Sequence, residues 1–363
     1  IADLEDVKRT VQERLITLQA EAQGEKEAIM RRLGEVAPEY VANSFMAETQ
    51  QRLEEMINLL ERLRENRPTL FMSAEERSEA ADQFLAEENF SAALEQYDEA
   101  ITIQPDKPSI WFGKAQALAG LERAEDAIAA LKDAIALDPS LAVAHYNLGL
   151  AYREQSQMQP AADAFWQATQ ADPNFTMAYV NLGAALLDSG NLEQAESYLQ
   201  RAVALEPELG ISHYNLGLVQ RRQGNLAAAL DSFLTAVGHS PQAPEIHYQI
   251  GLIYLQQNQL DGAVQALETA IAIDSNYPEA HYNLGITYFG RGESSSALEH
   301  FDRAIQLYPT FGHAYYSKGL ALAELGRTEE AEQILQQALA LYINQGRNQW
   351  VTNTQAQLNR IRQ

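Results

Sequence analysis

Residues 142–175 read AVAHYNLGLAYREQSQMQPAADAFWQATQADPNF, and the pentapeptide His-Tyr-Asn-Leu-Gly inside them recurs twice further along the chain. It occupies residues 145–149, 213–217 and 281–285, so each copy begins 68 residues after the one before. Half of that interval places a glycine every 34 residues from Gly149 to Gly319, with no insertion or deletion. Self-similarity at a fixed period of this length is typical of a helical repeat array.

Four further columns keep the same 34-residue step. Two alanine columns are unbroken over eight copies, at Ala93, Ala127, Ala161, Ala195, Ala229, Ala263, Ala297 and Ala331, and at Ala100, Ala134, Ala168, Ala202, Ala236, Ala270, Ala304 and Ala338. A bulky apolar column holds Tyr97, Leu131, Phe165, Leu199, Phe233, Leu267, Phe301 and Leu335, and a proline column holds Pro105, Pro139, Pro173, Pro207, Pro241, Ser275, Pro309 and Ile343. Small residues let two helices approach within about 8–10 Å, bulky residues fill the space left, and a proline after the second helix stops that helix.

These columns resemble the tetratricopeptide-repeat (TPR) consensus in every repeat from Ala74 to Gln345. The main departure is histidine at His145, His213, His247 and His281, where the family often has tryptophan; only Trp111 keeps it. The resemblance implies an all-α fold, a right-handed TPR superhelix (α-solenoid) of antiparallel helix pairs around a concave groove. We expect eight repeats, at 74–107, 108–141, 142–175, 176–209, 210–243, 244–277, 278–311 and 312–345.

The two ends of the chain do not follow the repeat. In residues 1–73 apolar side chains recur three or four apart, which predicts amphipathic helices arranged as a hairpin or a three-helix, coiled-coil-like extension. Ser73 followed by Glu76 predicts a capping box that opens the first repeat. In residues 346–363, Trp350, Leu358 and Ile361 share one helix face, which predicts a C-terminal capping helix.

Ligand-binding residues are expected on the first helix of each pair, because the resemblance implies that these helices line the groove. Their candidate amide column is Asn147, Asn181, Asn215, Gln249 and Asn283, and it is similar to the asparagine ladder in the superhelix of O-linked N-acetylglucosamine transferase. The neighbouring candidates are Tyr146, Tyr214, Tyr248, Tyr282 and Tyr316, with Arg153, Arg221 and Arg222. Carboxamides can pair with a peptide backbone, and tyrosines offer an apolar wall with polar tips. Both columns are also compatible with plain helix packing.

Chemistry beyond binding has little support in the sequence. A P-loop, a dinucleotide glycine fingerprint, an HExxH motif and a nucleophile elbow are all missing, so we expect no enzyme activity and no cofactor. The chain has no cysteine, and its column histidines are too far apart to share one metal, so no metal site is expected. A formal charge of −24 argues against a nucleic-acid partner. No stretch is long and apolar enough for a membrane span.

Three functions therefore remain open. The favoured one is a non-catalytic scaffold, adaptor or assembly factor that binds an extended or helical segment of partner proteins in the groove. The second is the substrate-recruiting part of a larger, glycosyltransferase-type enzyme, and the third is a self-assembling scaffold that oligomerises through residues 1–73. Composition favours a bacterial source. A cytoplasmic location is favoured, although a start at Ile1 leaves open a removed leader or anchor.

Overall fold

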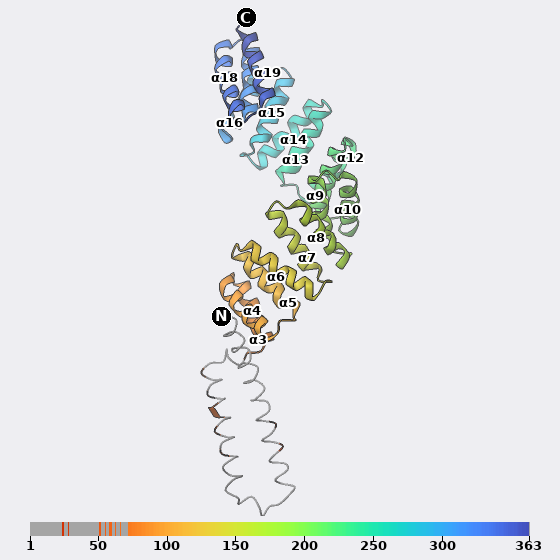
Figure 1. Ribbon diagram of the computed structural model, residues 1–363. Helices are drawn as coiled ribbons and strands as arrows, with labels where there is room; N and C mark the ends of the chain where they lie inside the picture. Colours follow the sequence, from red (N-terminus) through yellow and green to blue (C-terminus); the bar gives the residue numbers. More distant parts are fainter. Residues whose placement is uncertain are drawn as a thin grey trace, which may run out of the picture. The chain divides into compact units, whose positions relative to one another are not determined.

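The computed structural model describes residues 72–362, together with eight isolated positions between residues 24 and 66. The N-terminal extension expected over residues 1–73 therefore lies almost entirely outside the described residues. The chain divides into two compact units, residues 1–175 and residues 176–363. Figure 1 shows the helices of the described part, coloured along the sequence. All regular structure in the described part is helical, as the sequence predicted.

Both units are built from consecutive helices that pack in pairs. The first unit contains α3 (Ala74–Ala86), α4 (Phe90–Ile103), α5 (Pro108–Gly120), α6 (Ala124–Leu137), α7 (Ala142–Glu154) and α8 (Met158–Ala171). The second unit contains α9 (Thr176–Asp188), α10 (Leu192–Leu205), α11 (Gly210–Arg222), α12 (Leu226–His239), α13 (Pro244–Gln256), α14 (Leu260–Ile273), α15 (Pro278–Gly290), α16 (Ser294–Leu307), α17 (Gly312–Glu324), α18 (Thr328–Asn344) and α19 (Asn348–Ile361). Among the described helices, none is long and apolar enough to cross a membrane.

The repeating columns form the core of both units. The alanines of the two unbroken columns are almost fully buried, and the bulky column beside them is buried as well. A Cβ atom added at Gly217 would lie 2.7 Å from a ring carbon of Phe233, and one added at Gly149 would lie 2.6 Å from Phe165. The glycine therefore lets the first helix approach the aromatic ring of the second, which is the close approach that its position predicted.

The turn between the two helices of a pair contains a residue in the left-handed conformation at the same place in all eight repeats. Glycine occupies this place at Gly190, Gly224, Gly292 and Gly326, and other residues occupy it at Glu88, Glu122, Ser156 and Asn258. The non-glycine residues have φ values between 56° and 59°. Because side chains other than glycine, asparagine and aspartate rarely adopt this conformation, the tight turn is imposed by the packing of the two helices.

Helix ends follow the predicted signals. Ser73 Oγ accepts from the backbone N–H of Glu76, and Glu76 Oε2 accepts from the backbone N–H of Ser73 at 2.8 Å, which confirms the capping box. The second helices end two residues before the proline column, as α10 does at Leu205 before Pro207. In the last pair Ile343 replaces proline, and α18 runs for 17 residues instead of 14.

The histidines of the tryptophan column have a shared structural role. Trp111 donates its ring N–H to the backbone oxygen of Pro105 at 2.8 Å. The Nε2 atoms of His145, His213 and His247 lie 2.8–3.1 Å from the equivalent proline oxygens, six residues earlier. A histidine can therefore replace tryptophan here because both rings offer an N–H to the carbonyl that precedes the first helix.

The last helix, α19, packs against α18. Trp350 stacks on Tyr342 with ring centroids 5.6 Å apart, and its edge meets His313 at 4.5 Å. Arg347 Nη1 donates to His313 Nε2 at 2.8 Å, and His313 Nδ1 lies 2.9 Å from the hydroxyl of Tyr342. Since arginine has no acceptor, His313 must be neutral at Nε2 for this contact to form.

We expect the second unit to lose stability as the pH falls below about 6.5. Burial lowers the pKa of His281, His300 and His313 in the folded chain, and Arg347 lowers the pKa of His313 further. The unfolded chain therefore takes up protons first, near pH 6.5, and unfolding is favoured until the folded-state pKa values are passed. Thermal unfolding between pH 7.5 and 5.5 measures this slope. A variant with glutamine at all three positions should flatten it, and an unchanged slope would contradict the assignment.

Candidate partner-binding face

The predicted site residues lie on the first helices of the pairs, on α7 in the first unit and on α9, α11, α13, α15 and α17 in the second. We use the name first-helix face for three columns of side chains on these helices. They are the amide column, the tyrosine column and the column four residues before the amides, which holds Val143, Met177, Ile211, Glu245 and Glu279. In the second unit, α9 contacts α11, and α15 contacts both α13 and α17. The first-helix face of that unit is therefore built from neighbouring elements of the fold.

The asparagines of the amide column bond back to their own helices. Asn147 Nδ2 donates to the backbone oxygen of Val143 at 2.7 Å, and Asn215 Nδ2 donates to that of Ile211 at 2.9 Å. Asn181 and Asn283 make the same bond four residues back. A carboxamide has a second N–H and two acceptor lone pairs, so one such bond leaves hydrogen-bonding capacity at the partly exposed Asn147 for a ligand, whereas Asn181 and Asn215 are buried.

The tyrosine column and the amide column also meet between consecutive repeats of the second unit. Asn283 Nδ2 donates to the Tyr248 hydroxyl at 3.2 Å, 35 residues earlier in the chain. Tyr214 is hydrogen-bonded to Gln249, and Tyr282 to Ser317, at the same separation. These bonds join α11 to α13, α13 to α15 and α15 to α17, and they fix the directions of the polar groups on this part of the face.

The rings of the tyrosine column pack inward as well. Tyr146 lies 5.7 Å from Phe165 and 4.9 Å from Phe175, and Tyr214 lies 5.8 Å from Phe233, between ring centroids. Similar contacts join Tyr248 to Tyr277, Tyr282 to Phe301 and Phe311, and Tyr316 to Trp350. The tyrosines are half-buried, so they hold the helices together while showing only part of their surface to solvent.

Burial raises the pKa of Tyr214, Tyr248 and Tyr282 above the ordinary value for a phenol. The carboxylate of Glu279 adds to the shift at Tyr248, while Arg221 opposes it. These phenols therefore remain protonated at neutral pH, and their hydroxyl groups can both donate and accept hydrogen bonds.

The three predicted arginines differ in their surroundings. Arg221 is half-buried near Tyr214 and Tyr248, where its charge acts on both phenols. Arg222 Nη1 donates to the backbone oxygen of Leu187 at 3.0 Å, at the end of α9. Arg153 is exposed in the last turn of α7. Arg221 therefore lies among the tyrosines of the second unit.

An exposed aliphatic column escaped the sequence analysis. Val143, Met177 and Ile211 lie four residues before the asparagines, and their side chains are 41, 36 and 42% exposed. Glu245 and Glu279 continue the same column on α13 and α15, where both are exposed. The signal was present in the sequence, because large apolar residues recur at 34-residue spacing at a place that the core columns do not use.

A small, mostly apolar hollow adjoins Ile211. It has a volume of about 240 Å³ and is lined by Gly210, Ile211, Tyr214, Ser240, Ala243, Glu245 and Ile246. Its opening is therefore bordered by an aliphatic side chain, a phenol and a carboxylate. Such an arrangement can seat one aliphatic side chain of a ligand and can pair with a neighbouring cation. Within the described residues, no group of three or more acidic or histidine side chains is placed to hold a metal ion.

Comparison with curated proteins shows a partial likeness over a short stretch of the chain. The TPR repeat-containing thioredoxin TTL4 of Arabidopsis thaliana is 35% identical over 79 residues, which make up 22% of this chain and 12% of that protein. The chain therefore spans about an eighth of the length of the curated relative that it matches.

Solved structures share the fold at low sequence identity. The APC/C hetero-tetramer Cut9-Hcn1 gives a TM-score of 0.54 at 16% identity, covering 74% of this chain and 52% of that one. PilW, a type IV pilus biogenesis factor, gives a TM-score of 0.52 at 18% identity over 57% of this chain and 96% of its own.

Family models cover most of the repeat region. The model described as "Tetratricopeptide repeat" matches residues 78–142, 120–174, 180–244 and 282–345, and the model described as "TPR repeat" matches residues 251–292. These matches, the helical pairs and the fold likeness agree, and the chain belongs to the tetratricopeptide repeat family.

Proposed function

We propose that this protein is a protein-interaction scaffold whose first-helix face binds an extended segment of a partner protein. In this proposal residues 74–345 form the binding body, and residues 346–363 close its C-terminal end. Membership of the tetratricopeptide repeat family supports the general role, because these repeats are usually non-catalytic scaffolds for other proteins.

The observation that carries the proposal is the aliphatic surface on the first-helix face of the second unit. Met177 and Ile211 are large, apolar and exposed, although the core offers buried places to such residues in every repeat. Ile211 also borders the hollow that extends to Ile246. Exposed apolar groups beside a hollow and a polar rim are the arrangement that anchors a partner side chain.

The exposed carboxylates of this surface favour a ligand with basic residues, while Arg221 near Tyr214 acts in the opposite direction. Glu245 lines the hollow, and Glu279 continues the column on α15, where both carboxylates are exposed. The formal charge of the whole chain is −24, so long-range attraction acts in the same direction. We therefore infer a partner segment that places an aliphatic side chain in the hollow and a lysine or arginine towards Glu245.

A selection from a random 12-residue peptide library, followed by fluorescence anisotropy with the full chain, tests this. We expect the strongest peptides to combine aliphatic and basic residues, and Ile211→Asp to weaken their binding at least tenfold, because a hot-spot contact is lost. Leu234→Asp is the matched control, since Leu234 is 52% exposed but lies on α12, a second helix. Equal losses in both variants, or none in either, would rule out the first-helix face as the binding surface.

A further inference from the structure

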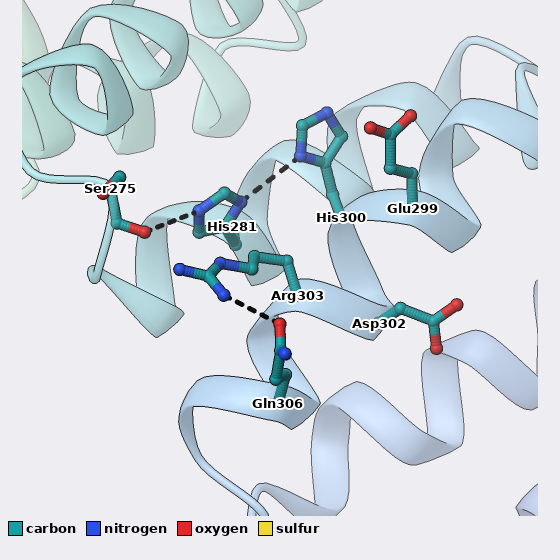
Figure 2. Close-up of a pocket in the computed structure, with 7 residues that line it drawn as sticks. All are labelled: Ser275, His281, Glu299, His300, Asp302, Arg303 and Gln306. Atoms are coloured by element: carbon teal, nitrogen blue, oxygen red, sulfur yellow. Dashed lines mark hydrogen bonds between the residues drawn. The ribbon is translucent and has the colours of Figure 1, made fainter.

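A second hollow lies between α15 and α16, and two histidines face each other inside it. Figure 2 shows His281 projecting from α15 and His300 from α16, with their rings turned towards one another. The hollow has a volume of about 500 Å³ and is also lined by Ser275, Glu299, Asp302, Arg303 and Gln306. It lies apart from the hollow at Ile211.

The distance between the two imidazoles fits a shared metal ion. His281 Nδ1 and His300 Nδ1 lie 3.4 Å apart, in a long hydrogen bond that Figure 2 draws as a dashed line and that a metal ion bound to both nitrogens would replace. Two nitrogens that bind one tetrahedral Zn²⁺ at about 2.0–2.1 Å lie about 3.4 Å from each other. The pair therefore already has the spacing that two ligands of one ion adopt.

The tautomer of His281 is set by a backbone carbonyl at the edge of the hollow. Its Nε2 lies 3.3 Å from the backbone oxygen of Ser275 and can act there only as a donor, as Figure 2 indicates with a dashed line. Nδ1 then carries a lone pair that points towards His300. A backbone carbonyl that holds the far N–H of an imidazole is the outer contact by which metal-binding histidines are usually oriented.

The electrostatic surroundings favour a cation at His300. The carboxylates of Glu268 and Glu299 act on its ring, and they oppose the burial that lowers its pKa. Burial also lowers the pKa of His281, so both rings are neutral at pH 7 and have lone pairs to give. The nearby cation, Arg303, lowers the pKa of His281 and so opposes a second cation on that side; it is held by Gln306 at 2.7 Å and by Asn276 at 3.1 Å.

The pair occurs once among the aligned repeats. His145 and His247 occupy the position of His281 and make the same contact with a preceding carbonyl. The residues 19 positions after them, where His300 stands, are Ala164 and Ala266. The repeat architecture explains His281, which holds the carbonyl before the first helix, but it gives no reason for His300.

We propose that His281 and His300 form a binding site for a divalent late transition metal ion, such as Zn²⁺. The two Nδ1 atoms supply the protein ligands, and water entering the open hollow fills the remaining positions. With two protein ligands the site is exchangeable, unlike the four-ligand sites that hold structural zinc.

Titration of the full-length, tag-free chain with ZnCl₂ at pH 7.5, followed by calorimetry, tests the proposal. We expect one site that His300→Gln weakens at least tenfold. His247→Gln is the matched control, because it removes a histidine that faces Ala266, and it should leave binding unchanged. In long-range ¹H–¹⁵N spectra, Zn²⁺ should shift the Nδ1 signals of His281 and His300 alone.

Circular dichroism of the metal-free variants checks that both remain folded to the same temperature. If His300→Gln unfolds, the ¹⁵N spectra of the unsubstituted chain provide the test, and the absence of Zn²⁺-induced shifts at the Nδ1 atoms of His281 and His300 would contradict the proposal. No binding at millimolar Zn²⁺ would overturn the proposal. Binding that His300→Gln leaves intact would also overturn it, since the ion would then be held by surface carboxylates.

Discussion

We expect Phe233→Ala to lower the free energy of unfolding of residues 176–363 by about 3–5 kcal/mol, as is usual for a buried phenylalanine. The Phe233 side chain is fully buried and lies between Tyr214, at 5.8 Å between ring centroids, and the backbone of Gly217. The cavity left by the ring cannot close easily, because α11 and α12 are held by the two alanine columns on either side. Urea unfolding followed by circular dichroism measures the loss.

The neighbouring residue provides the control. Leu234 is also large and apolar, but it is 52% exposed, so Leu234→Ala should change stability by no more than about 0.5 kcal/mol. Gly217→Ala gives a second test, since its new Cβ would lie 2.7 Å from the Phe233 ring. It should destabilise the natural chain and be tolerated once Phe233 is alanine. Equal effects in both backgrounds would contradict the account of the glycine column.

The fold was predictable because the same pattern of small and bulky residues specifies the same helix packing in all eight repeats. A single small residue has many explanations, but alanine at both Ala93 and Ala100, repeated every 34 residues, specifies where helices touch. The same logic explains the exception at the end of the array. With Ile343 in the proline column, the stop signal is missing and α18 continues to Asn344.

Turn conformation was less predictable. The sequence indicates a left-handed residue where glycine stands, as at Gly190 and Gly224, but gives no such indication at Glu88 or Glu122. There the conformation is imposed by the helices that the turn connects. Local propensity is a weak prior, and tertiary packing overrides it when the loop is short and both its ends are fixed.

The candidate site was predicted only in outline. The amide and tyrosine columns were placed on the first helices, but their hydrogen bonds depend on rotamers that spacing alone does not determine. Thus the sequence could not show that Asn283 bonds to Tyr248, or that Asn147 bonds to its own helix. The ladder of backbone contacts to a ligand stays a prediction. The exposure of Ile211 was not predicted, because spacing alone does not distinguish an exposed apolar residue from a buried one.

The first repeat has an ion pair at a position where four of the other repeats have a histidine, and this leads to the second large effect. Arg77 occupies the column of His281, and its side chain is 1% exposed. Its Nη1 pairs with Glu99 and donates to Gln96 at 3.2 Å, across from α3 to α4. Burial lowers the pKa of Arg77, which shows that the charge is held away from water.

We expect Arg77→Ala to lower the free energy of unfolding of the first unit by about 3 kcal/mol, since it breaks a buried pair and leaves a cavity. The value stands at the lower end of the usual range because Glu99 is 22% exposed and can regain some water. Lys107→Ala is the control. It removes a pair with Glu75 that lies in solvent, where the loss should stay below about 1 kcal/mol.

A double replacement separates the charge from the volume. Arg77→Met with Glu99→Gln keeps an apolar side chain of similar length in the core and removes both charges, so it should restore at least half of the stability lost in Arg77→Ala. Urea unfolding of the full chain, monitored as for Phe233, measures all three variants. If the double variant is as unstable as Arg77→Ala, the ion pair itself stabilises the first repeat. In that case an apolar side chain at position 77 would lower the stability of the first unit.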